Sequence, residues 1–193
     1  MGITLLKGGS VFTMDSNRTC YHPGYVLVEN NRIAQVGKGE PDSAGPCPDE
    51  VIDVTGQAVF PGFINIHSHA VLTALRGRAE DVDTVTAVYG LMVPMNEEVT
   101  PEDSYAMARL GLWEMLRTGV STVVESSAHM EAVAEAARSL GIRAYLVAGK
   151  IHDAVLSKVL QGTYEFDSKA PRPIKWVRVD KVTRGRYRSV GVI

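Results

Sequence analysis

The sequence predicts an α/β fold in which a small module of antiparallel strands precedes a parallel sheet with helices. Two observations carry this prediction. Short β-branched runs separated by Asn and Gly clusters fill residues 1–58, and this pattern is typical of β-hairpins. From Phe63 onward the pattern becomes strand, helix, strand, helix, strand, which indicates βαβ units. We therefore expect a β-module at 1–58, an α/β region at 59–167 and a separate tail at 168–193.

Within the first module, residues 25–28 and 32–37 are apolar or β-branched, and Asn30-Asn31 lies between them. Paired asparagines favour a tight hairpin turn. Residues 51–54 and 57–60 flank Thr55-Gly56 in a similar way, so we expect a second antiparallel pair that closes the module.

A helix is expected to begin at Thr100. The hydroxyl of Thr100 serves as N-cap, Pro101 occupies the first helical position, and Asp103 completes an [ST]-x-x-[DE] capping box. Gly119 ends this helix. One helical face carries the residues expected to be buried, which are Tyr105, Ala108, Leu112 and Met115.

The following pattern repeats the alternation. Residues 120–124 form an apolar run that ends in Glu125, residues 130–140 form a second helix closed by Gly141, and residues 142–148 form a third strand. In parallel α/β folds ligands gather at the carboxyl ends of the strands.

The run Pro61–Ala70 (PGFINIHSHA) carries the strongest functional signal. Side chains alternate along a strand, so Asn65, His67 and His69 are expected on one face, and Ile64, Ile66 and Ser68 on the other, apolar face. The two imidazoles then lie about 7 Å apart along the strand, close enough to converge on one metal ion. The alternative is a pair of hydrogen-bonded histidines at a strand end.

Composition and charge argue against a disulfide-rich secreted protein, a membrane-spanning protein and a protein with a strong overall charge. The chain has 193 residues, 45% of them hydrophobic and 22% charged, and a formal net charge of −2. Two cysteines make no disulfide framework, which favours a reducing, cytoplasmic location. The start has no signal-peptide pattern, and no apolar stretch is long enough to span a bilayer, so we expect no membrane partner.

Several motifs together resemble the amidohydrolase superfamily, in particular its branch of chlorohydrolases and aminohydrolases. The likeness covers residues 1–150 and is carried by residues 31–37, Pro61–His69, Leu75–Gly77, Val99–Asp103, Trp113–Val123 and Gly141–Ala144.

This resemblance implies a (β/α)₈ barrel of the TIM type together with a β-sandwich. It implies that His67 and His69 bind a divalent metal, zinc in the first place and iron as the alternative. The implied reaction is hydrolysis of a non-peptide C–N bond or a C–Cl bond in a small cyclic nitrogen compound by metal-activated water.

A barrel alone takes about 250 residues, so residues 59–193 are too few to complete one. The family also draws further metal ligands from later strands, for which no residues remain. We therefore expect a truncated chain, with a non-catalytic fragment as the alternative function. An open sheet edge would then favour a homo-oligomer.

The tail is basic: from Ser168 onward there are eight Lys and Arg residues and one acidic residue. We interpret it as a non-homologous, solvated extension. Contact with nucleic acid or acidic lipid, in which Trp176 and Tyr187 could stack on bases, is the less favoured alternative.

Three further residues are candidates for contact with a small-molecule substrate. Glu125 ends the second strand of the α/β region and could instead support the site from behind. His129 and His152 follow the second and third strands, and for both a surface position is the alternative.

Overall fold

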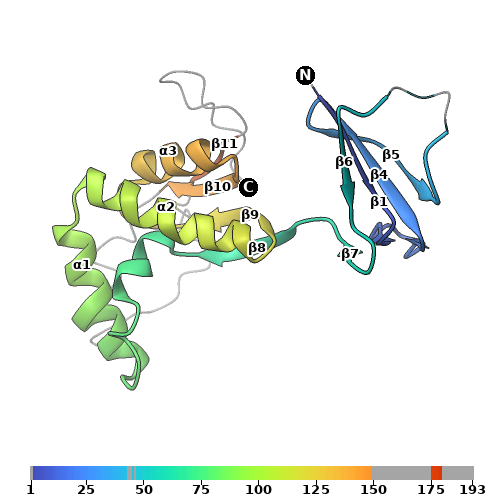
Figure 1. The fold of residues 1–193 in the computed structure, drawn as a ribbon. Coiled ribbons are helices and arrows are strands. Elements are labelled where there is room, and N and C mark those ends of the chain that lie inside the picture. The colour runs from blue at the N-terminus through green and yellow to red at the C-terminus, as the bar shows by residue number, and fades with distance from the viewer. Residues whose placement is uncertain (1, 43–44, 46, 149–174, 180–193) are drawn as a thin grey trace, which may run out of the picture. The chain divides into compact units, whose positions relative to one another are not determined.

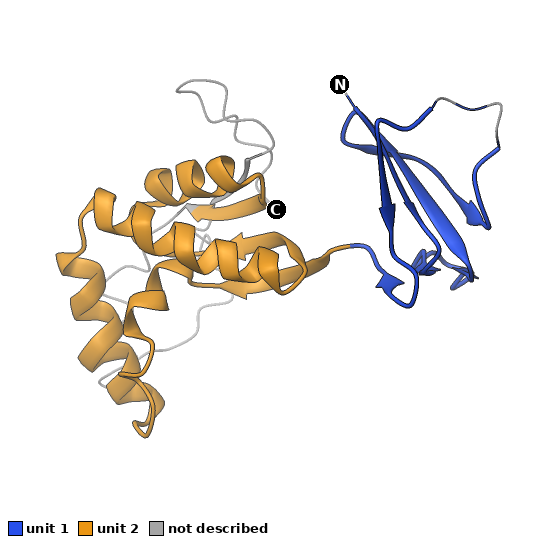
Figure 2. Ribbon diagram, viewed as in Figure 1, with its two compact units in different colours: residues 1–61 blue, residues 62–193 orange. Residues whose placement is uncertain are grey.

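The computed structural model describes residues 2–42, 45, 47–148 and 175–179. The chain divides into two compact units, Met1–Pro61 and Gly62–Ile193 (Figure 2).

The first unit consists of strands in two sheets. The four-stranded sheet has the order β5-β4-β1-β6 and the three-stranded sheet the order β3-β2-β7. The strands are β1 (Ile3–Lys7), β2 (Ser10–Phe12), β3 (Cys20–Tyr21), β4 (Gly24–Glu29), β5 (Arg32–Lys38), β6 (Glu50–Asp53) and β7 (Ala58–Val59). Leu5, Val11, Val26, Leu27 and Val54 are its buried apolar side chains.

The hairpin predicted around Asn30-Asn31 is confirmed. Strands β4 and β5 pair in antiparallel fashion, with Glu29 opposite Arg32. Asn30 and Asn31 have φ values of 50° and 65°. Asparagine tolerates this left-handed conformation better than most residues, and the turn matches the twist of the two strands.

The second predicted hairpin is wrong. Strand β6 pairs with β1 and strand β7 with β2, both in parallel, so the two strands join different sheets. The turn at Thr55-Gly56, closed by a hydrogen bond from the Gln57 amide to the Val54 carbonyl (2.9 Å), carries the chain from one sheet to the other. Pairing with β1 and β2 is non-local, which is why local turn chemistry did not indicate it.

The second unit is mixed α/β. Its elements are β8 (Phe63–Ser68), the 3₁₀ helix η1 (Ala70–Leu75), the π-helix η2 (Thr86–Met92), α1 (Val93–Glu98), α2 (Pro101–Arg117), β9 (Val120–Glu125), α3 (Met130–Leu140), β10 (Arg143–Ala148) and β11 (Lys175–Val179). The sheet order is β11-β10-β9-β8. Strands β8, β9 and β10 are parallel, as the alternation of elements predicted.

Helices α2 and α3 lie side by side on this sheet (Figure 1). Between them and the sheet is a core that includes the fully buried Leu112, Val123 and Val133. The predicted helix limits are confirmed: Thr100 caps α2 through a complete capping box with Asp103, and Gly141, at φ 73°, ends α3.

Strand β11 lies within residues 168–193, which the sequence indicated as a solvated tail. It extends the sheet in antiparallel fashion next to β10. Trp176 belongs to β11, whereas Tyr187 lies outside the described residues.

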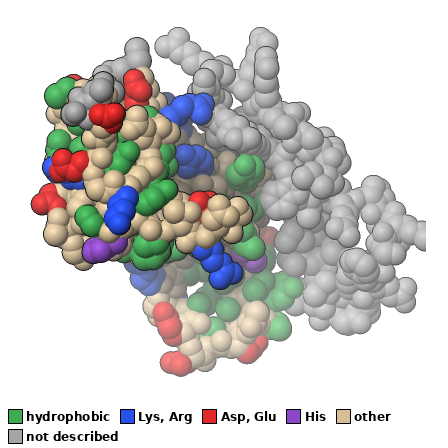
Figure 3. All heavy atoms as spheres, turned by 90° about the vertical axis from the view of Figure 1, so that its right-hand side faces the viewer, with side chains coloured by type: hydrophobic (Ala, Val, Ile, Leu, Met, Phe, Trp, Pro, Cys, Tyr) green, Lys and Arg blue, Asp and Glu red, His purple; other side chains and the backbone are tan. Residues whose placement is uncertain are grey.

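No helix in the described part of the chain is long and apolar enough to cross a membrane. Cys20 and Cys47 are both free and exposed. In the space-filling view, acidic and basic side chains occur together on the same face (Figure 3).

Strand β8 departs from regular alternation. Asn65 is opposite Val123, and Ser68 is opposite Glu125, so three steps along β8 correspond to two along β9. This extra residue is a β-bulge, and it places Asn65 and Ser68 on the same face. That face lies toward the helices, since the Asn65 amide contacts the Met115 sulfur of α2.

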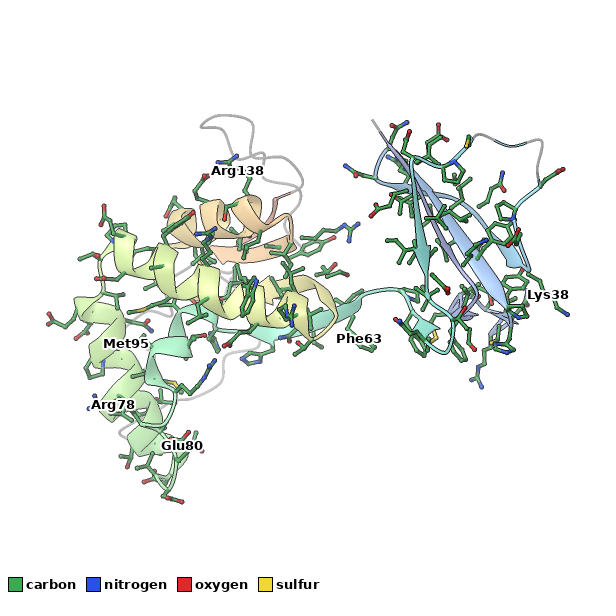
Figure 4. The ribbon with its side chains drawn as sticks, in the orientation of Figure 1. Lys38, Phe63, Arg78, Glu80, Met95 and Arg138 are labelled. Atoms are coloured by element: carbon green, nitrogen blue, oxygen red, sulfur yellow. The ribbon has the colours of Figure 1, made fainter. Side chains whose placement is uncertain are left out.

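The prediction that the isoleucine face of this strand is its packed back is wrong, because the helices lie on the Asn65 face instead. Phe63, Ile64 and Ile66 are 61%, 66% and 77% exposed, and it is Ser68 that is buried. Phe63 projects from the start of β8 in Figure 4. Ile64 and Ile66 alternate with Asn65 and lie on the face away from the helices, and the bulge places His67 on that face as well. The prediction that Asn65 and His67 share a face is therefore also wrong.

Candidate metal centre

The two histidines of the PGFINIHSHA run converge at the carboxyl end of β8. The Nε2 atoms of His67 and His69 are 3.0 Å apart. The ring centroids are 4.9 Å apart, and the ring planes are inclined by 80°. Two imidazole nitrogens bound to one Zn²⁺ at about 2.0–2.1 Å lie roughly 3.0–3.4 Å apart. The separation of the two nitrogens therefore fits a shared cation.

The hydrogen bonding of His69 fixes which of its nitrogens is free to bind. Nδ1 of His69 contacts the backbone carbonyl of Ser126, just after β9. A carbonyl oxygen can only accept, so Nδ1 carries the hydrogen, and in the neutral ring Nε2 keeps its lone pair. A second hydrogen bond of this kind orients metal-binding histidines in general.

The same geometry also allows a simple hydrogen bond. Because Nε2 of His69 is an acceptor, Nε2–H of His67 can donate to it across the 3.0 Å separation. A cation at this position would require His67 to carry its hydrogen on Nδ1 instead. The assignment of the pair as metal ligands therefore stays a prediction.

The described ranges supply two ligands here and no more. Within them, no group of three or more His, Cys, Asp or Glu side chains is placed to hold a metal ion. A catalytic zinc site takes three protein ligands in addition to water. Any further ligand must come from outside the described ranges.

Glu125 lies directly behind the pair and is fully buried. Its Oε1 accepts from the Ala70 amide at 2.9 Å and from the Ser127 hydroxyl at 2.5 Å, and its Oε2 lies 2.5 Å from the Ser68 hydroxyl. Glu125 shares its side of β9 with Val123, which belongs to the core under the helices. Its carboxylate thus points away from the open face, and a direct substrate contact stays an untested prediction.

His129 has its own hydrogen-bond partner, the backbone carbonyl of Val99. It precedes α3 in the left-handed conformation, at φ 51°, and its Nε2 lies 2.8 Å from the carbonyl of Val99, which it can reach only as a donor. The ring is exposed and ties the β9–α3 loop to the end of α1. A substrate role for His129 stays a prediction, and His152 lies outside the described residues.

Helix α2 holds the segment after His69 in place. A side chain at Gly111 would lie 2.6 Å from Oγ1 of Thr73 and 2.8 Å from the carbonyl of Ala70, so only glycine allows α2 to approach η1 this closely.

At the end of η1, Arg76 forms a two-pronged ion pair with Glu114 of α2. This hydrogen bonding lowers the pKa of Glu114 and raises that of Arg76. Both side chains are substantially exposed, so the pair adds little to stability.

Sequence reasoning missed three residues of this site: Ser68, Ser126 and Ser127. A signal for Ser68 existed, because a polar residue stood on a face that alternation predicted to be apolar. The Ser126 carbonyl carries no side-chain signal, since any residue could supply it.

A known protein family matches the part of the chain that contains the histidine pair. The sequence profile described as the amidohydrolase family matches residues 58–176.

Among curated relatives, the chain is 37% identical over 147 residues to 5-methylthioadenosine/S-adenosylhomocysteine deaminase of Thermococcus sibiricus, covering 76% of this chain and 33% of that one. It is 32% identical over 151 residues to 5′-deoxyadenosine deaminase of Methanosarcina barkeri, covering 78% and 34%. The chain thus spans about a third of the length of these relatives.

Solved structures give a similar result. A triazine hydrolase variant matches with a TM-score of 0.67 at 26% identity, covering 76% of this chain and 35% of the other. An adenosine deaminase from Xanthomonas campestris with bound zinc matches with a TM-score of 0.66 at 25% identity, covering 73% and 32%.

Proposed function

The chain belongs to the amidohydrolase family, and we propose that it contributes the first metal ligands of a metal-dependent hydrolase that acts on a C–N or C–Cl bond of a small cyclic nitrogen compound. The observation that carries this proposal is the 3.0 Å separation of the His67 and His69 Nε2 atoms. On this proposal, β8, β9 and β10 are the first strands of a (β/α)₈ barrel.

Within this proposal, the names of the relatives favour deamination of an adenine nucleoside as the reaction. Two of them are named as deaminases of 5-methylthioadenosine, S-adenosylhomocysteine or 5′-deoxyadenosine, at 37% and 32% identity. Atrazine chlorohydrolase from Arthrobacter aurescens, solved with zinc and atraton, matches at 26% identity, which keeps dechlorination as the alternative reaction.

Zinc is the proposed cation, because imidazole nitrogens suit it and several of the structural neighbours contain it. Iron is the alternative. Bound there, the cation would supply a water of lowered pKa as the nucleophile at neutral pH. His67 and His69 would hold it through Nε2, and the Ser126 carbonyl would keep the Nδ1 hydrogen of His69 away from it.

The test combines metal analysis with turnover. The 193-residue chain is loaded with Zn²⁺, dialysed and analysed for metal, and ammonia release from 5′-deoxyadenosine and chloride release from atrazine are measured. A retained stoichiometric ion together with ammonia release supports the proposal. An ion-free chain without either turnover would contradict it.

A second candidate function is a non-catalytic chain with an incomplete metal site. The observation in its favour is that the described ranges offer only two ligands. Reversible metal binding that dialysis removes, with no turnover of either substrate, is the expected result for this candidate. A cytoplasmic location and a homo-oligomer remain further predictions.

A further inference from the structure

Glu125 is a buried carboxylate that the proposed reaction does not use. It makes three hydrogen bonds, and all three come from residues beside the histidine pair or its partner carbonyl. Ser68 and Ala70 are the two chain neighbours of His69. Ser127 follows Ser126, whose carbonyl accepts from Nδ1 of His69.

We propose, resting on the metal-site function above, that Glu125 is a positioning residue that clamps His69 in its metal-binding orientation and tautomer. Its Oε1 accepts hydrogen bonds from both Ala70 and Ser127, and its Oε2 accepts one from Ser68. The backbone on both sides of His69 is thereby fixed to the loop that carries the Ser126 carbonyl. The carboxylate lies on the helix side of β9, away from the face that would hold the cation. It therefore affects metal binding only through the position of His69.

The clamp makes a specific prediction for the conservative variant. In Glu125→Gln, the amide oxygen can still accept from Ala70 and Ser127, and the amide nitrogen can donate to the Ser68 hydroxyl. Ser68 can then donate to the Val124 carbonyl, which already lies 3.0 Å from it. Glutamine therefore keeps the geometry but not the charge, whereas Glu125→Ala loses both.

The test uses the full chain as wild type, Glu125→Gln, Glu125→Ala and Ser68→Ala. The matched control is Ser104→Ala, because Ser104 is another fully buried serine of the same unit and its Oγ has no hydrogen-bond partner among the described residues. Two readouts are needed. Nitrogen NMR of the metal-free protein in alkaline buffer reports the His69 tautomer, and Co²⁺ titration reports the affinity and the ligand-field spectrum.

We expect wild type, Glu125→Gln and Ser104→Ala to show a single Nδ1–H tautomer and similar Co²⁺ binding. Glu125→Ala should lose about 10–100-fold in affinity, the range found when partners of metal-binding residues are removed, and should mix the two tautomers. If Glu125→Ala fails to fold, Ser68→Ala carries the test and should show the same changes to a smaller extent.

Two results would overturn the clamp. One is a folded Glu125→Ala or Ser68→Ala with wild-type tautomer and affinity. The other is a loss in Glu125→Gln as large as that in Glu125→Ala, because charge rather than position would then act. A fixed tautomer in a wild-type chain that binds no Co²⁺ would instead support the clamp and contradict the metal-site function.

Discussion

Asn65 and Ser68 of β8 face the same side of the sheet although they are three positions apart. The β-bulge between them turns both toward the helices and leaves Ile66 and His67 on the open face. Exposed Ile66 and His67 thus lie on one face, and buried Ser68 lies on the other.

The exposed strand residues predict self-association. Ile64 and Ile66 are 66% and 77% exposed on β8, a strand at the edge of its sheet, and such edges promote aggregation. Ile64→Thr/Ile66→Thr should reduce the oligomeric fraction measured by light scattering and leave the melting temperature nearly unchanged. Leu112→Ala, which removes a fully buried side chain, is the contrasting control and should lower the melting temperature. An oligomeric fraction that does not respond to the double threonine change would contradict this role.

The close contact of α2 with η1 predicts a strong effect at Gly111. Gly111→Ala places Cβ against Thr73 and the Ala70 carbonyl, so the free energy of unfolding should fall by about 1–3 kcal/mol, as for other overpacked sites. In the matched change Gly90→Ala, Cβ meets only Cγ2 of Thr86, at 3.7 Å. Alanine there should be neutral or stabilising by up to about 1 kcal/mol. Equal effects in urea denaturation would show that the packing is looser than described.

The capping box of α2 predicts a loss of stability in Thr100→Ala. The Thr100 hydroxyl accepts from the Asp103 amide at 3.1 Å, and losing such a cap costs about 1 kcal/mol. Urea denaturation at neutral pH measures it. An unchanged midpoint would mean that the box contributes nothing.

The same box predicts a pH dependence. Hydrogen bonding from Thr100 lowers the pKa of Asp103 below its ordinary value, so the stabilisation is complete above that ordinary value and is lost as the pH falls through the lowered pKa. Asp103→Asn should therefore be less stable than wild type at neutral pH, and the difference should vanish in acid. A difference between Asp103→Asn and wild type that is constant with pH would contradict the lowered pKa.

Local chemistry made the helix ends and one hairpin predictable. Thr100, Gly141 and the Asn30-Asn31 turn each act through atoms within a few residues of themselves. Parallel pairing of β8, β9 and β10 followed from the alternation of elements.

Non-local geometry explains what the sequence did not reveal. The bulge in β8 depends on its register with β9, and alternation assumes one residue for each step along the partner. The surroundings of Glu125 depend on donors more than 50 residues away, at Ser68 and Ala70. Only the buried position of a carboxylate at a strand end indicated that such donors must exist.

The central claim is that His67 and His69 together bind one divalent cation. The most direct measurement is the metal content, after Zn²⁺ loading, of wild type and of His67→Ala/His69→Ala. The control is His22→Ala/His129→Ala, which removes two histidines with other partners, the Ser10 hydroxyl and the Val99 carbonyl. We predict that wild type and control bind the ion and that the His67/His69 variant does not. Equal zinc content in all three proteins would contradict the account.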